Sequence, residues 1–351
     1  MKTKTFAAAV LASSLALPAF AADTIVFDPD GTGGANGNFL VGAFDWSAGS
    51  TLSDDSIPAS SPSSFDTYSH GVLVGLLDNA GDPAGAPTGL NTDGSGFEIT
   101  FISGFTETIT SLTTSAAAIQ TDNGGVGTDV YTFDQTITLA DAAVQTVNFF
   151  KVYYDDLSDG LNLKSSSLAG TGFGDGVLIL DGTVTAVDGN FTTHFEFVDT
   201  DNDGIYTAGT DTLQSFIVLD QSSNGDDWAG QLSVDGEGAT SLEADVTFQD
   251  NAFFKSDISS LFADLFFNTS NVLPFGETNP SRLLDDGAGG FITPVLGSVN
   301  GLTGPDILFQ TDANNSFVTT VPEPGSMLLL GMGLFSLGMT KRRKVKSLSV
   351  A

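Results

Sequence analysis

Apolar and polar residues alternate along several stretches in the middle of the chain. The stretch LEADVTFQ places its apolar side chains at every second position: Leu242, Ala244, Val246 and Phe248. The same spacing recurs in FTTHFEFV (191–198) and at the start of FEITFISGF (97–105). Because successive side chains of a strand point to opposite faces, this period of two predicts strands with one buried and one solvated face.

Three further stretches predict elements of other kinds. VNFFKVYY (147–154) is apolar on both faces, which is typical of a strand in the centre of a sheet. In GVLILDGTVTAV (176–187), Asp181-Gly182 separates two short apolar runs and predicts a tight hairpin. SDISSLFADLFF (256–267) carries apolar residues on one helical stripe. It predicts either a short helix capped by Ser256 or a helical turn that runs into a strand.

Clusters of Gly, Asn, Asp and Ser separate these runs and predict turns, and the segments 47–64 and 78–96 have the composition of flexible loops. The chain has 41 glycines, which suit the turns, and 28 phenylalanines, which fill the space between sheets. This pattern predicts an all-β fold. We expect an acidic β-sandwich over residues 22–317, either simple or elaborated in the manner of a jelly roll.

The first residues have the pattern of an export signal. Lys2 and Lys4 precede an apolar run that ends at Leu17, and the triplet Ala19-Phe20-Ala21 follows. A charged start, an apolar stretch of about a dozen residues and an A-x-A triplet form a signal peptide. We therefore predict that residues 1–21 form a signal helix for Sec export, with cleavage between Ala21 and Ala22.

The last residues combine an extended strip, an apolar run and a basic cluster. Prolines keep residues 318–326 from forming a helix and predict an accessible linker. The apolar segment 327–340 predicts a transmembrane helix about 20 Å long, which is short against a hydrocarbon core of about 30 Å. The bases of residues 341–351 should stay in the cytoplasm. A helix this short is retained only weakly in the membrane. This suits the substrate of a processing protease better than a permanent anchor.

The order of these three parts resembles the PEP-CTERM sorting signal of Gram-negative bacteria. The residues that carry the resemblance are Val321, Pro322, Glu323, Pro324, Gly325, Ser326, Lys341, Arg342, Arg343 and Lys344. The resemblance implies a transient intermediate in the inner membrane, where an exosortase processes the tail before the protein reaches the cell surface or the extracellular matrix.

The region before the tail resembles the flocculation-associated PEP-CTERM proteins. The segments that carry this likeness lie between about 147 and 317, and include VNFFKVYYDD, LAGTGFGDGVLILDGTV and FFNTSNVLPFGETNPSRL. Before residue 147 the likeness is weaker. It implies an exported protein that cells need in order to aggregate into flocs with exopolysaccharide. It implies no enzyme activity and supplies no catalytic residues.

The acidic residues are concentrated in the exported region. All 43 acids lie between Asp23 and Glu323, whereas only four of the 11 bases do: Lys151, Lys164, Lys255 and Arg282. This balance excludes nucleic acid, which requires a basic surface, and favours cations or cationic partners. The chain has no cysteine, so disulfides do not stabilise it.

The residues needed for nucleophilic catalysis are scarce. The chain has two histidines, His70 and His194, and no G-x-S-x-G motif around a serine. Paired carboxylates could hydrolyse glycosides, but 43 acids produce pairs by chance. We therefore predict that the protein is not an enzyme.

One segment has the local pattern of a calcium loop. In DTDNDGIYTAGTD, carboxylates stand at positions 1, 3 and 5, a glycine follows at position 6, and position 7 can offer its backbone carbonyl. The expected ligands are Asp199, Asp201, Asp203, Ile205 and Asp211. Asp211 comes one residue later than in an EF-hand, so we predict a looser structural Ca²⁺ site in a β-hairpin loop. The alternative is a polar turn without an ion, and we predict no other cofactor.

These observations support three functions in decreasing order. The first is a structural or adhesive matrix protein that promotes flocculation with exopolysaccharide. The second is a secreted carbohydrate-binding module, for which Trp228 could stack on a sugar ring, although a buried or loop-anchoring tryptophan is more common. The third is an extracellular hydrolase, which the sequence does not favour.

Overall fold

The computed structural model describes residues 23–34, 37–54, 63–121, 129–158, 164–165, 172–201, 203, 210, 212–216, 236–268 and 307–319. Every regular element within these ranges is a β-strand. The predictions for the signal helix, the PEP linker, the transmembrane helix and the basic tail fall outside them.

The three stretches in which alternation predicted strands, 97–105, 191–198 and 242–249, all lie within strands. In chain order they are β1 Ile25–Phe27, β2 Phe39–Val41, β3 Ala43–Asp54, β4 Ser63–Leu77, β5 Pro83–Gly85, β6 Phe97–Thr114, β7 Ala118–Thr121, β8 Val130–Asp141, β9 Asn148–Asp156, β10 Val177–Val198, β11 Thr212–Phe216, β12 Gly236–Gln249, β13 Ile258–Asn268 and β14 Ile307–Thr319.

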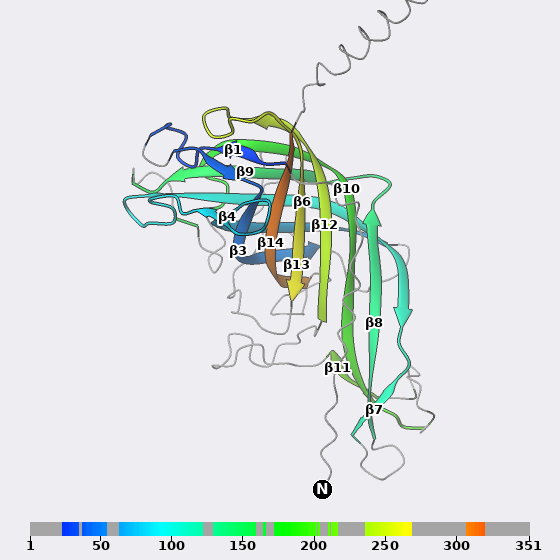
Figure 1. The fold of residues 1–351 in the computed structure, drawn as a ribbon. Coiled ribbons are helices and arrows are strands. Elements are labelled where there is room, and N and C mark those ends of the chain that lie inside the picture. Colours follow the sequence, from blue (N-terminus) through cyan, green and yellow to red (C-terminus); the bar gives the residue numbers. More distant parts are fainter. Residues whose placement is uncertain are drawn as a thin grey trace, which may run out of the picture.

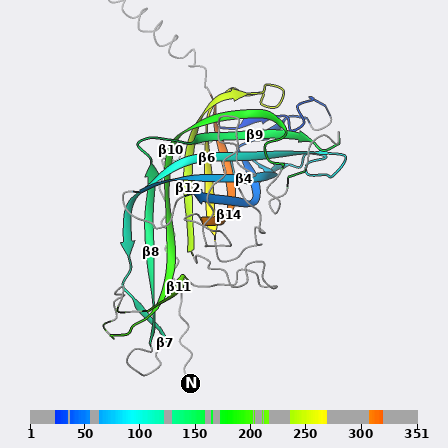
Figure 2. The ribbon, with the colours of Figure 1, turned by 180° about the vertical axis from the view of Figure 1, so that it is seen from behind.

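All but two of these strands belong to one antiparallel sheet. β1 and β2 pair with each other, and the remaining twelve strands run in the order β5-β4-β3-β14-β13-β12-β10-β9-β6-β8-β7, with β11 beside β10. β4 pairs with β3 on one side and with β6 on the other, so the sheet closes on itself. Figures 1 and 2 show two layers, with β4, β6 and β9 crossing over β3, β12, β13 and β14. The all-β prediction is confirmed, and the two layers are parts of one closed sheet.

The main core fills the space between the two layers. It contains Trp46, Phe44, Phe101, Leu242 and Leu265 among many buried side chains from β1, β3, β4, β6, β9, β10, β12, β13 and β14. The indole Nε1 of Trp46 donates a hydrogen bond to Asn315 Oδ1 at 2.7 Å, which satisfies its one polar atom inside the core. Trp46 is therefore a core residue, and it is not exposed to stack on a ligand.

Two local predictions were wrong at the point where β10 pairs with a β-bulge in β12. Asp181-Gly182 does not form a hairpin: β10 continues from Val177 to Val198 and pairs with β9 and β12 on its two sides. Asp181 faces Phe248 whereas Gly182 faces Val246, so β12 has one extra residue at this point. The bulge shifts the alternation of β12. Phe248 is consequently 46% exposed, and not buried as predicted.

Two other segments are more extended than predicted. Residues 258–268 form strand β13, so the short-helix alternative is wrong. Leu261, Ala263, Leu265 and Phe267 are buried at every second position, between β12 and β14. The predicted loop 47–64 is wrong at its ends, since 47–54 belongs to β3 and 63–64 to β4. The predicted loop 78–96 contains one strand, β5, and is otherwise without strands or helices.

Gly49 lies where β3 meets β4, and we expect Gly49→Ala to be strongly destabilising. A Cβ at this position would lie 1.9 Å from the backbone carbonyl oxygen of His70, which cannot rotate away as a side chain could. Overpacking of this kind costs about 3 kcal/mol. Urea denaturation of the mature protein measures the loss. Gly174→Ala is the control, because its nearest contact would be an ordinary 3.7 Å; equal stability of the two variants would contradict the packing described here.

Candidate functional site

The first candidate site is the acidic loop between β10 and β11. These strands pair antiparallel, with Val198 opposite Thr212, so the loop connects a hairpin as predicted. β7, β8, β10 and β11 extend beyond the closed part of the sheet as a narrow arm, and the loop follows the far end of β10 (Figure 1). Phe197 packs against the rings of Tyr131 and Phe133, at centroid distances of 5.5 and 5.8 Å, and these contacts stabilise the arm.

Three carboxylates converge in this loop. One oxygen from each of Asp199, Asp201 and Asp203 lies within 4.8 Å of the others. Asp199 is fully buried, whereas Asp201 and Asp203 are exposed. The backbone N–H of Asp199 donates to the carbonyl of Asp129 at 3.3 Å, which fixes the start of the loop against the segment before β8. Carboxylates at this separation repel one another unless a cation lies between them, so the cluster could hold a metal ion.

The remaining predicted ligands cannot be placed. Ile205 and Asp211 lie outside the described residues, as does Trp228. The predicted signal-cleavage residues Ala19, Ala21 and Ala22 and the sorting residues 321–326 and 341–344 do so as well. The structure therefore brings together the first three members of the predicted metal site.

The two histidines occupy different environments. His194 lies on the solvated face of β10, and its Nδ1 is 2.7 Å from Asp134 Oδ1 on β8. His70 is buried on β4 with its ring centroid 4.0 Å from that of Phe173. Burial lowers the pKa of His70 to about 3, so this imidazole stays neutral at physiological pH.

The second candidate site is a groove at a seam in the sheet. β6 pairs with β9 up to Phe105 and with β8 from Glu107 onward, so Thr106 has no strand neighbour on that side. The side chain of Gln145 takes the place of the missing strand. Its Oε1 accepts from the Thr106 N–H at 3.1 Å, and its Nε2 donates to the Thr106 carbonyl at 3.2 Å. This pairing fixes the 142–147 loop against β6.

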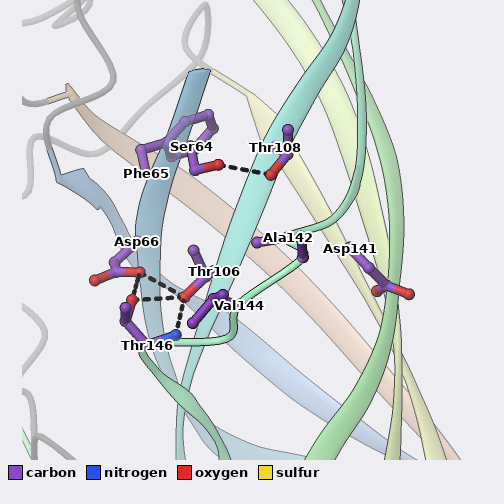
Figure 3. Close-up of a pocket in the computed structure, with 10 residues that line it drawn as sticks. Ser64, Phe65, Asp66, Thr106, Thr108, Asp141, Ala142, Val144 and Thr146 are labelled. Carbon is purple, nitrogen blue, oxygen red and sulfur yellow. Dashed lines mark hydrogen bonds between the residues drawn. The ribbon is translucent and has the colours of Figure 1, made fainter. Parts of the chain in front are cut away.

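The groove has a volume of about 600 Å³, which is within the usual range for ligand sites. Its lining residues are Ser64, Phe65, Asp66, Thr106, Thr108, Asp141, Ala142, Ala143, Val144 and Thr146. Figure 3 shows Asp66, Thr106 and Thr146 converging on one another, with the Ser64–Thr108 pair farther along the same two strands. Asp66 Oδ1 accepts from the hydroxyls of Thr106 and Thr146 at 2.7 and 2.9 Å.

Sequence reasoning missed this groove. Its residues come from three segments, 64–66, 106–108 and 141–146, which the register of β4, β6 and β8 brings together. None of the three has a recognisable motif. The exchange of β9 for β8 beside Thr106 creates the groove, and local sequence patterns do not reveal an exchange of strand partners.

A buried carboxyl group lies on the opposite side of the sheet from the groove. Glu107 is 1% exposed and accepts hydrogen bonds from the hydroxyls of Thr67, at 2.6 Å, and Thr240, at 2.8 Å. Burial raises the pKa of Glu107 from 4.5 to about 7, and the two hydroxyl hydrogen bonds lower it in part. The buried hydroxyl of Thr51 forms hydrogen bonds with the buried hydroxyls of Ser69 and Thr311, so part of the interior is polar.

Comparison with known proteins identifies a sorting motif near the end of the chain. Residues 320–344 match the PEP-CTERM protein-sorting motif. Neither a curated protein nor a solved structure matches the chain. Within the described part of the chain, no helix has the length and apolar character needed to cross a membrane.

The motif match confirms the sorting signal expected from residues 321–326 and 341–344. Such a motif implies a protein that is exported, processed by an exosortase and sorted to the cell surface. The last described strand, β14, ends at Thr319, so the motif begins at the next residue.

Proposed function

We propose that this protein is a structural or adhesive component of the extracellular matrix that promotes flocculation of a Gram-negative bacterium together with exopolysaccharide. Sec exports the chain, the tail holds it briefly in the inner membrane, and an exosortase processes it before it reaches the surface or the matrix. The observation that carries this proposal is the PEP-CTERM motif directly after an acidic all-β domain. The resemblance of residues 147–317 to flocculation-associated proteins supplies the biological role.

Contacts at the start and end of the described domain support this order of events. The backbone N–H of Asp23 donates to the Phe317 carbonyl at 3.0 Å. The N–H and hydroxyl of Thr319 both donate to Asp23 Oδ2, at 2.9 and 2.8 Å. Asp23 follows the predicted cleavage site by two residues, and Thr319 precedes the motif. These contacts join the first and last described residues of the β domain and use no residue of the tail.

Settling of cells tests the proposed role. A strain that lacks the gene should remain dispersed, because the matrix would lose the protein that holds coated cells together, and a plasmid copy of the full chain should restore settling. The measurement is the clearing of a standing culture, with equal amounts of exopolysaccharide verified in both strains. Settling of the deletion strain at the parental rate would refute the flocculation role.

A calcium ion in the Asp199–Asp203 loop forms a second part of the proposal. The support is the convergence of three carboxylates and their spacing in the sequence. We expect 10 mM Ca²⁺ to stabilise the mature protein by about 3 kcal/mol, the value for a ligand at about a hundred times its Kd. The melting temperature should rise with Ca²⁺ and not with Na⁺ at matched ionic strength.

Two variants make the calcium test specific. Asp201→Asn with Asp203→Asn should remove the calcium-dependent rise, whereas the same change at the exposed Asp245 of β12 should leave it intact. Equal melting of the parent protein in the two salts would eliminate the site. The removal of floc cohesion by a chelator would extend the role of calcium to the matrix.

The alternative function is a carbohydrate-binding module. The groove beside Thr106 favours it, because its hydroxyl and carboxylate groups are arranged on a rigid part of the sheet. The two functions are compatible, since a matrix protein can act by binding the matrix polymer. We propose no hydrolase activity and no binding to nucleic acid.

A further inference from the structure

The seam groove has a fixed shape in the protein as it stands. Three of its sides belong to different elements: Asp66 is on β4, Thr106 is on β6, and Thr146 is in the loop between β8 and β9. The loop is attached to β6 by the Gln145 side chain at one point and by Thr146 at another. The N–H of Thr146 donates to Thr106 Oγ1 at 3.0 Å.

A second hydrogen bond holds the same seam in place. Asp141, the last residue of β8, accepts a hydrogen bond through Oδ1 from the N–H of Val187 on β10. β10 also changes its neighbouring strand at this seam. It pairs with β9 up to Thr183 and with β8 from Asp188 onward. Side chains thus replace missing strand contacts on both neighbours, and a ligand would meet a preformed surface with little ordering cost.

The polar groups of the groove retain capacity for a ligand. Asp66 Oδ1 is occupied by two hydroxyls, while Oδ2 makes no hydrogen bond among the described residues. A carboxylate oxygen can accept two further hydrogen bonds, and a threonine or serine hydroxyl can both donate and accept. Asp66 is therefore held in position by protein donors and still presents one oxygen to a donor from outside.

Small apolar groups lie beside these polar atoms. Ala142, Ala143 and Val144 belong to the lining, and Val144 is 73% exposed although it is aliphatic. The adjacent Phe65 is buried beneath the surface and packs with Ile109 and Leu139. The groove thus combines hydrogen-bonding groups on one strand pair with an exposed aliphatic side chain on the loop.

The acidic, hydroxyl and aliphatic groups of the groove favour some classes of ligand over others. Two of the lining residues, Asp66 and Asp141, are acidic and none is basic, so an anionic ligand would be repelled. A wholly apolar ligand would leave the hydroxyls and the Asp66 carboxylate without partners. A neutral sugar presents hydroxyls that both donate and accept, together with C–H groups that pack against aliphatic side chains. It satisfies both kinds of surface in the groove.

We propose that the groove formed by Ser64, Asp66, Thr106, Thr108, Val144 and Thr146 binds a neutral segment of a polysaccharide. Asp66 Oδ2 accepts hydrogen bonds from sugar hydroxyls, and Val144 packs against a C–H face of the ring. This inference deepens the proposed function, on which it rests for the availability of polysaccharide, by naming the site and the charge class of the sugar.

The test uses oligosaccharides released by partial hydrolysis of the exopolysaccharide from the bacterium that makes this protein. Ion exchange separates them into neutral, acidic and basic fractions, and each is titrated into the full mature protein by calorimetry and by methyl NMR. We expect saturable binding of the neutral fraction, with shifts at the methyl groups of Val144 and Ala143. Binding of the acidic or basic fraction alone, or of none, would overturn the proposal.

Variants locate the binding in the groove. Asp66→Ala should weaken binding of the neutral fraction by about tenfold or more, the expected loss for a hydrogen bond to a charged group. Thr146→Val should also weaken it, because the variant lacks the hydroxyl that holds Asp66 Oδ1 in position. Thr146 is exposed, so its isosteric variant should fold even if the Asp66 variant does not. Asp245→Asn, on the exposed face of β12, should bind as the parent does. Parental affinity in a folded groove variant would refute the site.

Cell settling separates this inference from the function on which it rests. If the strain without the gene fails to settle but the groove variants bind and settle normally, the matrix role stands and the groove proposal fails. If the strain without the gene settles normally while the neutral sugars still bind through Asp66, the groove proposal stands and the flocculation role fails.

Discussion

Replacement of Glu107 by glutamine should remove a loss of stability that the parent protein undergoes between about pH 4.5 and pH 7. The carboxyl is buried with two hydroxyl partners, and its pKa is raised from 4.5 to about 7. Above pH 4.5 the unfolded chain releases this proton readily, whereas the folded protein retains it until about pH 7. The folded state binds more protons over this interval, so its contribution to stability decreases as the pH rises.

The size of this effect follows from the shift. One pKa unit corresponds to about 1.4 kcal/mol. The raised pKa of Glu107 should therefore lower the free energy of unfolding of the parent by about 3 kcal/mol at pH 8 relative to pH 4. Glutamine has nearly the same shape as a protonated glutamate and carries no charge. At pH 8 the variant should therefore be more stable than the parent, and near pH 4 the two should be nearly equal.

Urea denaturation at several pH values measures this difference. Other acids also titrate in this chain, so the informative quantity is the difference between variant and parent at each pH. Glu237→Gln is the matched control, because Glu237 is an exposed glutamate on β12. A difference that does not change with pH would show that Glu107 does not retain its proton inside the sheet.

A chain that ends at Thr320 should fold normally and still fail to reach its destination. The hydrogen bonds that join Asp23 to Phe317 and Thr319 are complete before the motif begins. We therefore expect the truncated mature protein to melt at the same temperature as the full mature chain. In cells it should be exported and then accumulate in the soluble periplasmic fraction, since it lacks the apolar run and the basic cluster that hold the intermediate at the membrane.

Fractionation of cells, followed by detection of a tag within the predicted 78–96 loop, measures this change. A second chain with Lys341, Arg342, Arg343 and Lys344 replaced by serine retains the apolar run and tests the basic cluster separately. It should also be mislocalised. Surface levels equal to those of the full chain in both cases would show that the tail does not direct sorting.

The fold was predictable where one local rule acts alone. Phe97, Ile99 and Phe101 are buried in the main core, as expected from a period of two. The solvated opposite face predicted for this strand is wrong, because Glu98 and Thr100 are buried as well. In contrast, residues 258–268 satisfy a helical stripe and a strand alternation together, and pairing with β12 and β14 decides in favour of the strand. Asp181-Gly182 suits a tight turn, but its pairing with β9 and β12 on the two sides keeps it inside a continuous strand, opposite a bulge in β12.

The two candidate sites also differ in how far local sequence patterns predict them. Asp199, Asp201 and Asp203 are neighbours in the sequence, so their spacing was enough to predict that their carboxylates converge. Asp66, Thr106 and Thr146 are far apart in the sequence and meet only through strand register and through Gln145, which replaces a strand neighbour. Closure of the sheet depends likewise on the pairing of β4 with β6, a long-range contact that no local pattern specifies.

The mass of the protein in the matrix tests the central claim most directly. Intact mass spectrometry of the surface or matrix form should show a chain that begins at Ala22 and lacks the basic cluster Lys341–Lys344, as expected after removal of the signal peptide and processing of the tail. In a strain without the exosortase, the basic cluster should be retained and the protein should remain with the inner membrane. A matrix form that still contains residues 341–344 in the parental strain would contradict exosortase processing.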